Sequence, residues 1–231
     1  MKLQTDWNCH LLPMMGEWIT AACDTLEALL RLNARTGIRR FCMMSEFDPE
    51  REPLPCFLIE RDCAVREVRR ILPGGFRIIP GGYVRFRQGV STIPGLSRLC
   101  LPNTDLLPVL LPWNAFPQEL AVEWNRMLYH SPYHPLLMEA DRFLTVYPKD
   151  AADRLLRLQS VVYQFGFHSL LNPAIRKAIR FLLNRGATVL LGSGVNSPGS
   201  AAYFDFRTAA DAAIADFGAE RFSELLYARP V

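Results

Sequence analysis

Residues 2–13, KLQTDWNCHLLP, join a predicted strand, Lys2 to Trp7, to a loop that holds Asn8, Cys9 and His10. Polar side chains at the end of a strand are a common feature of functional sites, because loops on a rigid scaffold present reactive groups. The same arrangement, an apolar strand followed by polar residues, recurs along the chain. We therefore expect one site built from the ends of several strands.

Helical and strand-like patterns alternate after this opening. Apolar residues at helical spacing, with Gly or Pro at the ends, predict helices over Glu17–Thr36, Cys56–Leu72, Phe116–His130, Lys149–Leu158, Ala174–Asn184, Thr208–Phe217 and Ala219–Tyr227. Short apolar runs predict further strands over Ile38–Met44, Phe76–Ile79, Tyr83–Phe86, Leu106–Leu111, Pro135–Met138, Val161–Phe165 and Thr188–Leu191. Pro108 interrupts one of these strands and argues against it. Gln88–Thr104 is expected to be an irregular excursion, and Gly192–Ser200 a loop of small residues.

This alternation predicts an α/β fold, with about seven parallel strands and right-handed helical crossovers. No linker divides the chain, so residues 1–231 are expected to form a single domain. The sheet is either open and doubly wound or closed into a barrel. Neither G-x-G-x-x-G nor G-x-x-x-x-G-K-[ST] follows a strand, which argues against the usual nucleotide-binding folds. We favour a TIM-like barrel, whose polar groups gather at the carboxyl ends of its strands.

The composition excludes several classes of protein. Half of the 231 residues are hydrophobic, which excludes a disordered chain. The 26 Lys and Arg residues barely exceed the 23 Asp and Glu residues, so no nucleic-acid partner is indicated, and the basic run Arg66–Arg70 is assigned no function. The six cysteines include no C-x-x-C pair. No apolar run approaches the ~20 residues that span a membrane, so we expect a cytoplasmic protein without membrane insertion.

Partial motifs in a fixed order carry a resemblance to a known family. The matching residues are Asp6, His10, Leu12 and Pro13; Gly81, Val84 and Arg85; Arg142; Gln164, Ser169 and Leu170; and Ser193. The corresponding family motifs are D-x-H-x-H-x-L-P, G-x-E-v-r, A-H-P-E-R-Y, Q-x-n-x-x-S-l and S-D-x-H. Over nearly its whole length the chain resembles the polymerase and histidinol phosphatase (PHP) family, and within it the bacterial capsule-locus protein-tyrosine phosphatases.

The resemblance implies a distorted (β/α) barrel and a cluster of divalent metal ions held by His and carboxylate side chains. Several of the implied ligand positions carry other residues in this chain. These departures are Asn8, Phe47 and Glu139 in place of His, Tyr83 in place of Glu, and Gly194 and Asn196 in place of the closing Asp and His. Because a metal cluster activates water and neutralises phosphate charge together, losing most ligands removes both effects.

We therefore interpret the chain as a pseudoenzyme, a catalytically impaired relative of these phosphatases with a binding or regulatory role and no cofactor. No residue is assigned to catalysis. Arg142 and Arg85 are candidate phosphate contacts, because guanidinium groups bind phosphate without a metal. The resemblance implies a tyrosine kinase or a phosphorylated ligand as the partner, and a role in capsule polysaccharide regulation.

The alternative is an active phosphoesterase with a reduced metal site. Asn8, His10, Glu17 and Glu139 carry the amide, imidazole and carboxylate groups that one divalent ion accepts, whether manganese, zinc or iron. In the simpler interpretation these groups only hydrogen-bond one another.

Overall fold

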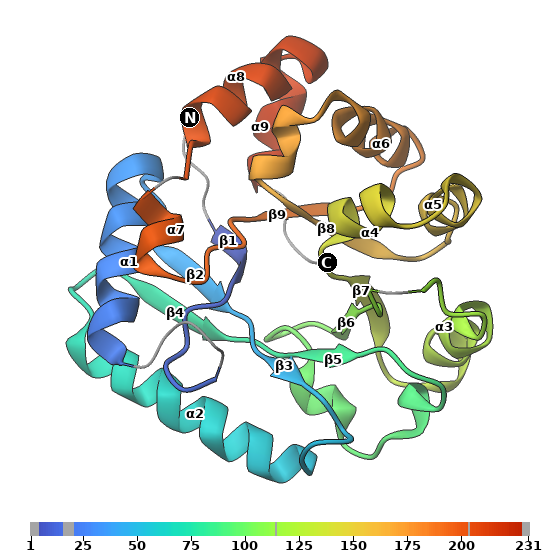
Figure 1. Ribbon diagram of the computed structural model, residues 1–231, viewed down its shortest axis with the longest axis horizontal. Coiled ribbons are helices and arrows are strands. Elements are labelled where there is room, and N and C mark those ends of the chain that lie inside the picture. The colour runs from blue at the N-terminus through green and yellow to red at the C-terminus, as the bar shows by residue number, and fades with distance from the viewer. Residues whose placement is uncertain (1–4, 16–20, 114, 203, 228–231) are drawn as a thin grey trace.

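The protein was examined as a computed structural model, which describes residues 5–15, 21–113, 115–202 and 204–227 (Figure 1). The strands of the described part are β1 (Thr5–Cys9), β2 (Arg40–Met43), β3 (Glu46–Phe47), β4 (Arg77–Pro80), β5 (Tyr83–Arg85), β6 (Leu106–Leu110), β7 (His134–Leu137), β8 (Val162–Gly166) and β9 (Val189–Gly192). Its α-helices are α1 (Ala22–Thr36), α2 (Leu54–Ile71), α3 (Leu120–His130), α4 (Ala140–Val146), α5 (Lys149–Leu156), α6 (Pro173–Asn184), α7 (Pro198–Ala202), α8 (Phe206–Phe217) and α9 (Ala219–Tyr227).

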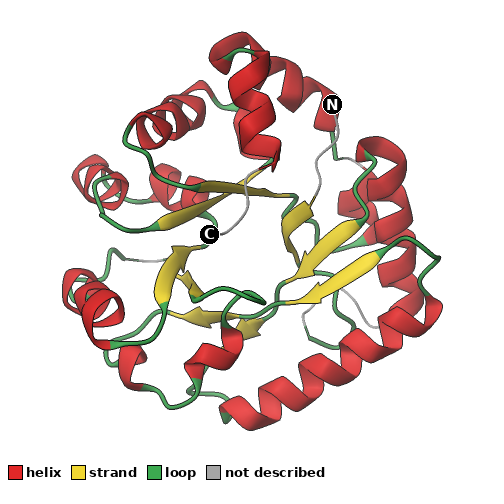
Figure 2. Ribbon diagram, turned by 180° about the vertical axis from the view of Figure 1, so that it is seen from behind, coloured by secondary structure: helices red, strands yellow, loops and turns green. Residues whose placement is uncertain are grey.

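All strand pairs in the described part are parallel, and they form two sheets. One sheet has the order β1-β2-β4, and the other has the order β3-β5-β6-β7-β8-β9. Helices follow most strands and lie outside them, as Figure 2 shows. The mixed α/β class with parallel strands is therefore confirmed.

Two chain segments pass from the first sheet into the second. β2 pairs with β4, with Arg40 opposite Arg77, and β3 pairs with β5, with Glu46 opposite Tyr83. The residue numbers of paired positions differ by the same amount in the two pairings. β2 and β3 therefore behave as one interrupted strand. The backbone bonds Gly81 N–H to Met43 C=O (2.9 Å) and Tyr83 N–H to Ser45 C=O (3.0 Å) bridge the interruption.

The first and last strands meet at a seam between β1 and β9. The N–H of Gly194 donates to the carbonyl of Asn8 at 2.8 Å, and the N–H of His10 donates to the carbonyl of Val195 at 2.8 Å. A Cβ atom on Gly192 would lie 2.6 Å from the backbone nitrogen of Asn8 and 2.5 Å from its Cβ. Only Gly allows the two backbones to approach this closely.

Each predicted helix and strand is found in the predicted order, with shifted ends. The helix over Glu17–Thr36 is described from Ala22, and residues 16–20 lie outside the described residues. Gly37 ends it in the left-handed conformation at φ 74°, as expected of a C-terminal Gly. Asn8 and Cys9 belong to β1 and not to the predicted loop, because the strand pairs with β2 as far as Cys9.

Four further differences have local causes. Pro108 does not interrupt β6, because β5 pairs with β6 only from Val109 onward, so Pro108 lies beside β7 alone, as at a sheet edge. α7 replaces part of the loop predicted over Gly192–Ser200. α4 and the two-residue β3 were not predicted, since both are too short for a periodic pattern.

The core is continuous around the strands. Its largest fully buried side chains are mostly aromatic and include Trp124, Tyr163, Phe41, Phe47, Phe57, Phe143, Phe165, Phe167 and Phe222. Within the described part of the chain, no helix is both long and apolar enough to cross a membrane.

Gly192→Ala is expected to lower the free energy of unfolding by about 3 kcal/mol, because the added methyl group overlaps the Asn8 backbone. Gly74→Ala is the matched control, since a Cβ there meets no atom within 4 Å. The free energy of unfolding of the Gly74 variant is expected to stay within about 0.5 kcal/mol of the parent value. Urea unfolding of the three proteins measures both effects. Equal stability of the two variants would show that the seam tolerates a wider spacing.

Candidate functional site

A cleft of about 590 Å³ opens at the carboxyl ends of the strands. Its lining includes residues that come shortly after the ends of several strands: His10 after β1, Met44 after β2, Trp113 after β6, Glu139 after β7 and Gly194 after β9. In parallel α/β folds this end of the strands carries the functional groups. A cleft therefore lies at the strand ends, where the sequence predicts the site.

Glu139 has an unusual backbone conformation at the start of α4. Its φ and ψ of 51° and 43° lie in the left-handed region, which residues other than Gly seldom adopt. The side chain of Gln164 accepts a hydrogen bond from the Glu139 N–H at 2.9 Å, and this contact holds the backbone in place. Such conformations cost about 1–3 kcal/mol and occur often at functional sites.

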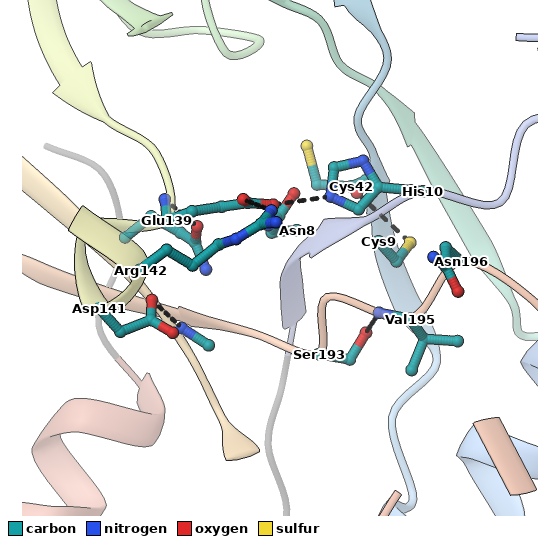
Figure 3. A network of polar contacts seen from close by, with 12 residues as sticks. Asn8, Cys9, His10, Cys42, Glu139, Asp141, Arg142, Ser193, Val195 and Asn196 are labelled. Atoms are coloured by element: carbon teal, nitrogen blue, oxygen red, sulfur yellow. Dashed lines mark hydrogen bonds and ion pairs between the residues drawn. The ribbon is translucent and has the colours of Figure 1, made fainter. Parts of the chain in front are cut away.

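The carboxylate of Glu139 joins three side chains in one network (Figure 3). Its Oε1 lies 3.2 Å from Nε2 of His10 and 3.4 Å from Nδ2 of Asn8, and its Oε2 forms an ion pair with Arg142. Burial by itself would raise the pKa of Glu139, but the hydrogen bond and charge of His10 and the charge of Arg142 lower it below its usual value. Glu139 is thus held as a carboxylate.

Arg142 also stacks on an aromatic ring. Its guanidinium carbon lies 3.2 Å from the ring centroid of Trp113, a cation–π contact. Trp113 was not among the predicted site residues. Its position shortly after the end of β6 is the signal that could have identified it.

A second group of charges lines the opposite part of the cleft. Arg85 forms ion pairs with Glu46 and, at 3.6 Å, with Asp48, and Asp48 also lies 3.4 Å from Arg51. Counting the whole lining, the carboxylates are Glu46, Asp48, Glu52, Glu60 and Glu139, and the guanidinium groups are Arg51, Arg85 and Arg142. Carboxylates outnumber guanidinium groups, so the cleft carries an excess of negative charge.

Two aromatic side chains occupy positions at which the sequence resemblance implies metal ligands. Tyr83 is only 8% exposed and meets the imidazole of His10 edge to face, with the ring centroids 5.8 Å apart. Burial raises the pKa of the Tyr83 hydroxyl well above its usual value. Phe47 is 1% exposed and packs against Phe57 at 5.4 Å between ring centroids. Tyr83 fills space next to the polar network, whereas Phe47 belongs to the apolar core.

Asp6, two residues before Asn8 in β1, and Asn8 itself are almost fully buried. Oδ1 of Asp6 accepts hydrogen bonds from the N–H groups of Ser193 (2.8 Å) and Asn8 (3.1 Å), which ties β1 to β9. Among the described residues, Oδ2 of Asp6 and Oδ1 of Asn8 find no hydrogen-bond partner. Burial raises the pKa of Asp6 to about 6, although the contacts with Ser193 and Asn8 act against the rise.

The structure brings together some of the predicted site residues. His10, Asn8 and Glu139 form one cluster with Arg142, whereas Arg85 belongs to the second group of charges. Glu17, the fourth predicted metal ligand, lies outside the described residues.

The donors present do not fit the metal cluster of the family. Within the described ranges, no group of three His, Cys, Asp or Glu residues could hold a metal ion. Of the donors at the cluster, Glu139 is already bound to Arg142 and His10, and Asn8 is a neutral ligand. Asn8 also has a buried Oδ1 without a hydrogen-bond partner among the described residues.

Comparison with known proteins gives a structural match. No protein-family model and no curated protein matches the chain. A chain from the crystal structures of YwqE from Bacillus subtilis and CpsB from Streptococcus pneumoniae, described as unique metal-dependent tyrosine phosphatases, matches with a TM-score of 0.74 at 17% identity. The match covers 96% of this chain and 91% of that chain. This chain has the fold of those phosphatases. The resemblance that the motifs predicted is confirmed at the level of the fold.

Asp6→Asn is expected to change how stability depends on pH. Because the folded pKa of Asp6 is about 6 and the unfolded value is 3.8, the folded state binds the proton more tightly, and stability falls as the pH rises through 4 to 6. This loss of stability amounts to roughly 3 kcal/mol. The Asn variant does not show it, because its side chain does not titrate. Urea unfolding of both proteins in EDTA, between pH 4 and pH 7, measures the difference. A constant difference across this range would contradict the raised pKa.

Proposed function

We propose that the chain is a catalytically impaired relative of the PHP-type tyrosine phosphatases, with a binding role in its cleft. We further propose that residues 1–231 form a single distorted (β/α) barrel. The order of strand pairing supports closure, since β2 and β4 continue into β3 and β5, and the last strand, β9, contacts the first through the seam. The fold likeness to metal-dependent phosphatases supports the ancestry.

The carboxylate network around Glu139 carries the proposal of impaired catalysis. His10, Asn8 and Arg142 all contact this one carboxylate, so the polar groups at the strand ends satisfy one another. Tyr83 and Phe47 add no basic ligand atoms, because a phenol with a raised pKa stays protonated and a phenyl ring has no lone pair. His10 and Arg142 are both engaged by this carboxylate, which leaves the cluster poorly arranged to activate water.

The charge of the cleft limits the ligands that bind there. Arg142 and Arg85 are the predicted phosphate contacts, and both are paired with carboxylates. A phosphorylated ligand, such as the tail of a bacterial tyrosine kinase, has to displace Glu139 or Glu46 from these arginines. We propose such a tail as the partner, in the cytoplasm and in capsule polysaccharide regulation, and we expect its affinity to be weak in the unmodified protein.

One observation favours a second candidate, an active phosphoesterase with a single divalent ion near His10. The buried Oδ1 of Asn8 lacks a partner, and a buried oxygen acceptor without a donor is costly unless something binds it. Manganese, zinc or iron bound by Asn8, His10 and Glu139 would satisfy it, and would require Glu139 to leave Arg142.

Elemental analysis and a turnover assay distinguish the two candidates. Protein purified without added metal is expected to contain no stoichiometric metal and to show no hydrolysis of an aryl phosphate, with or without manganese. His10→Ala tests the cluster, and His134→Ala is the control, because His134 pairs with Asp105 outside the cleft. One metal per chain, with turnover lost in the His10 variant and kept in the His134 variant, would establish the phosphoesterase.

Glu139→Gln is expected to strengthen the binding of a phosphotyrosine peptide by about tenfold, because it frees the guanidinium group of Arg142 for a charge-assisted hydrogen bond. Fluorescence anisotropy compares this peptide with its unphosphorylated form. The double variant Glu139→Gln, Arg142→Gln is expected to lose the gain. Equal binding of the two peptides by all variants would contradict a role for Arg142 in phosphate recognition.

A further inference from the structure

Six arginines from neighbouring segments have no carboxylate partner in the described structure. Most other arginines, including those of the cleft, form ion pairs. The six come from the start of β2, the second half of α2 and the start of β4, and no ion pair is found for them anywhere in the described chain: Arg39, Arg40, Arg66, Arg69, Arg70 and Arg77. Without them the 26 Lys and Arg residues would no longer outnumber the 23 Asp and Glu residues. Unpaired positive charge thus gathers in this region.

Three of these arginines line a pocket of about 540 Å³, here called the arginine pocket: Arg40, Arg69, Arg77 and the segment 72–76, with Ile78 and Ile79. Arg40 and Arg77 are direct partners in the β2–β4 pairing, so their side chains leave the sheet on the same face. Arg69 donates to the carbonyl of Ile78 at 2.9 Å, which anchors its guanidinium group against β4. No carboxylate lines the pocket.

The segment between α2 and β4 adds backbone donors to this pocket. The N–H of Phe76 donates to the carbonyl of Pro73 at 3.3 Å, and Gly75 has a φ of 89°. The N–H groups of Gly74 and Gly75 donate no hydrogen bond to any described residue. Nη1 of Arg39 approaches the same turn, 3.3 Å from where a Cβ of Gly75 would lie. Unpaired backbone N–H groups beside guanidinium groups are the usual elements of an anion site.

The arginine pocket is separate from the cleft. Arg40 and Arg77 are the first residues of β2 and β4, whereas the cleft is lined by residues that follow the last residues of the strands. The two sites share no lining residue. In Figure 1 the end of α2 and the start of β4 lie at the rim of the molecule.

We infer that the arginine pocket binds a small soluble ligand that carries phosphate groups. Guanidinium groups match the geometry of phosphate oxygens and offer several donors to each group. The volume of the pocket suits a small molecule and not an extended polymer. The apolar side chains of Leu72, Phe76 and Ile79 in its lining supply contacts for the uncharged part of the ligand. Nucleic acid is disfavoured, because the overall charge of +3 leaves no extended basic surface.

Inorganic pyrophosphate is the probe, and isothermal titration calorimetry on the full chain measures its binding. We expect Arg40→Gln and Arg77→Gln each to weaken binding by about tenfold or more, because each removes a charged donor. Arg98→Gln is the matched control, since Arg98 is exposed, has no ion pair in the described structure and lies outside the pocket. All three side chains are exposed, so circular dichroism is expected to report folded variants.

Two further measurements separate this site from other sources of binding. His10→Ala in EDTA is expected to bind pyrophosphate as the parent does, because the cleft takes no part. Duplex DNA and vesicles containing phosphatidylglycerol are expected to bind at least about tenfold more weakly than pyrophosphate. No binding of pyrophosphate, equal loss in the Arg98 variant, or preferred binding of DNA or vesicles would overturn the inference.

Discussion

The close approach of β1 and β9 is the constraint on which the site depends. Gly192 lets the backbone of Asn8 come within van der Waals contact, and Asp6 receives the N–H of Ser193 across the same seam. This contact joins the two ends of the strand order. It sets His10 and Asn8 beside the loop that follows β9, and it leaves Glu139, from the middle of the chain, facing them. A wider seam would separate the polar network into single residues.

The two ends of the strands differ in whether their arginines are paired with carboxylates. In the cleft, each guanidinium group is neutralised by a neighbouring carboxylate, and Glu139 alone holds His10, Asn8 and Arg142. At the other end, guanidinium groups and backbone N–H groups face a pocket without a carboxylate. In the first arrangement the charged groups satisfy one another, and the second leaves donors available for an anion.

Sequence patterns predicted the fold class, because apolar runs bounded by Gly and Pro are typical of buried strands. They failed where pairing with neighbours decides the structure: Pro108 is tolerated because β5 does not pair beside it, and Glu139 begins a helix from a left-handed backbone. In the site, motif order pointed to His10 and Glu139. It could not reveal that Arg142 stacks on Trp113, since that contact joins residues from different strand ends.

The arginine pocket and the cleft place opposite charges at the two ends of the strands, an arrangement that contributes a dipole along them. The positive end is at the first residues of β2 and β4, and the negative end is at the cleft. In the field of a polyanion such a dipole turns the positive end inward before contact, which biases the orientation of every encounter. The cleft then faces away from the anion and stays accessible to a second molecule.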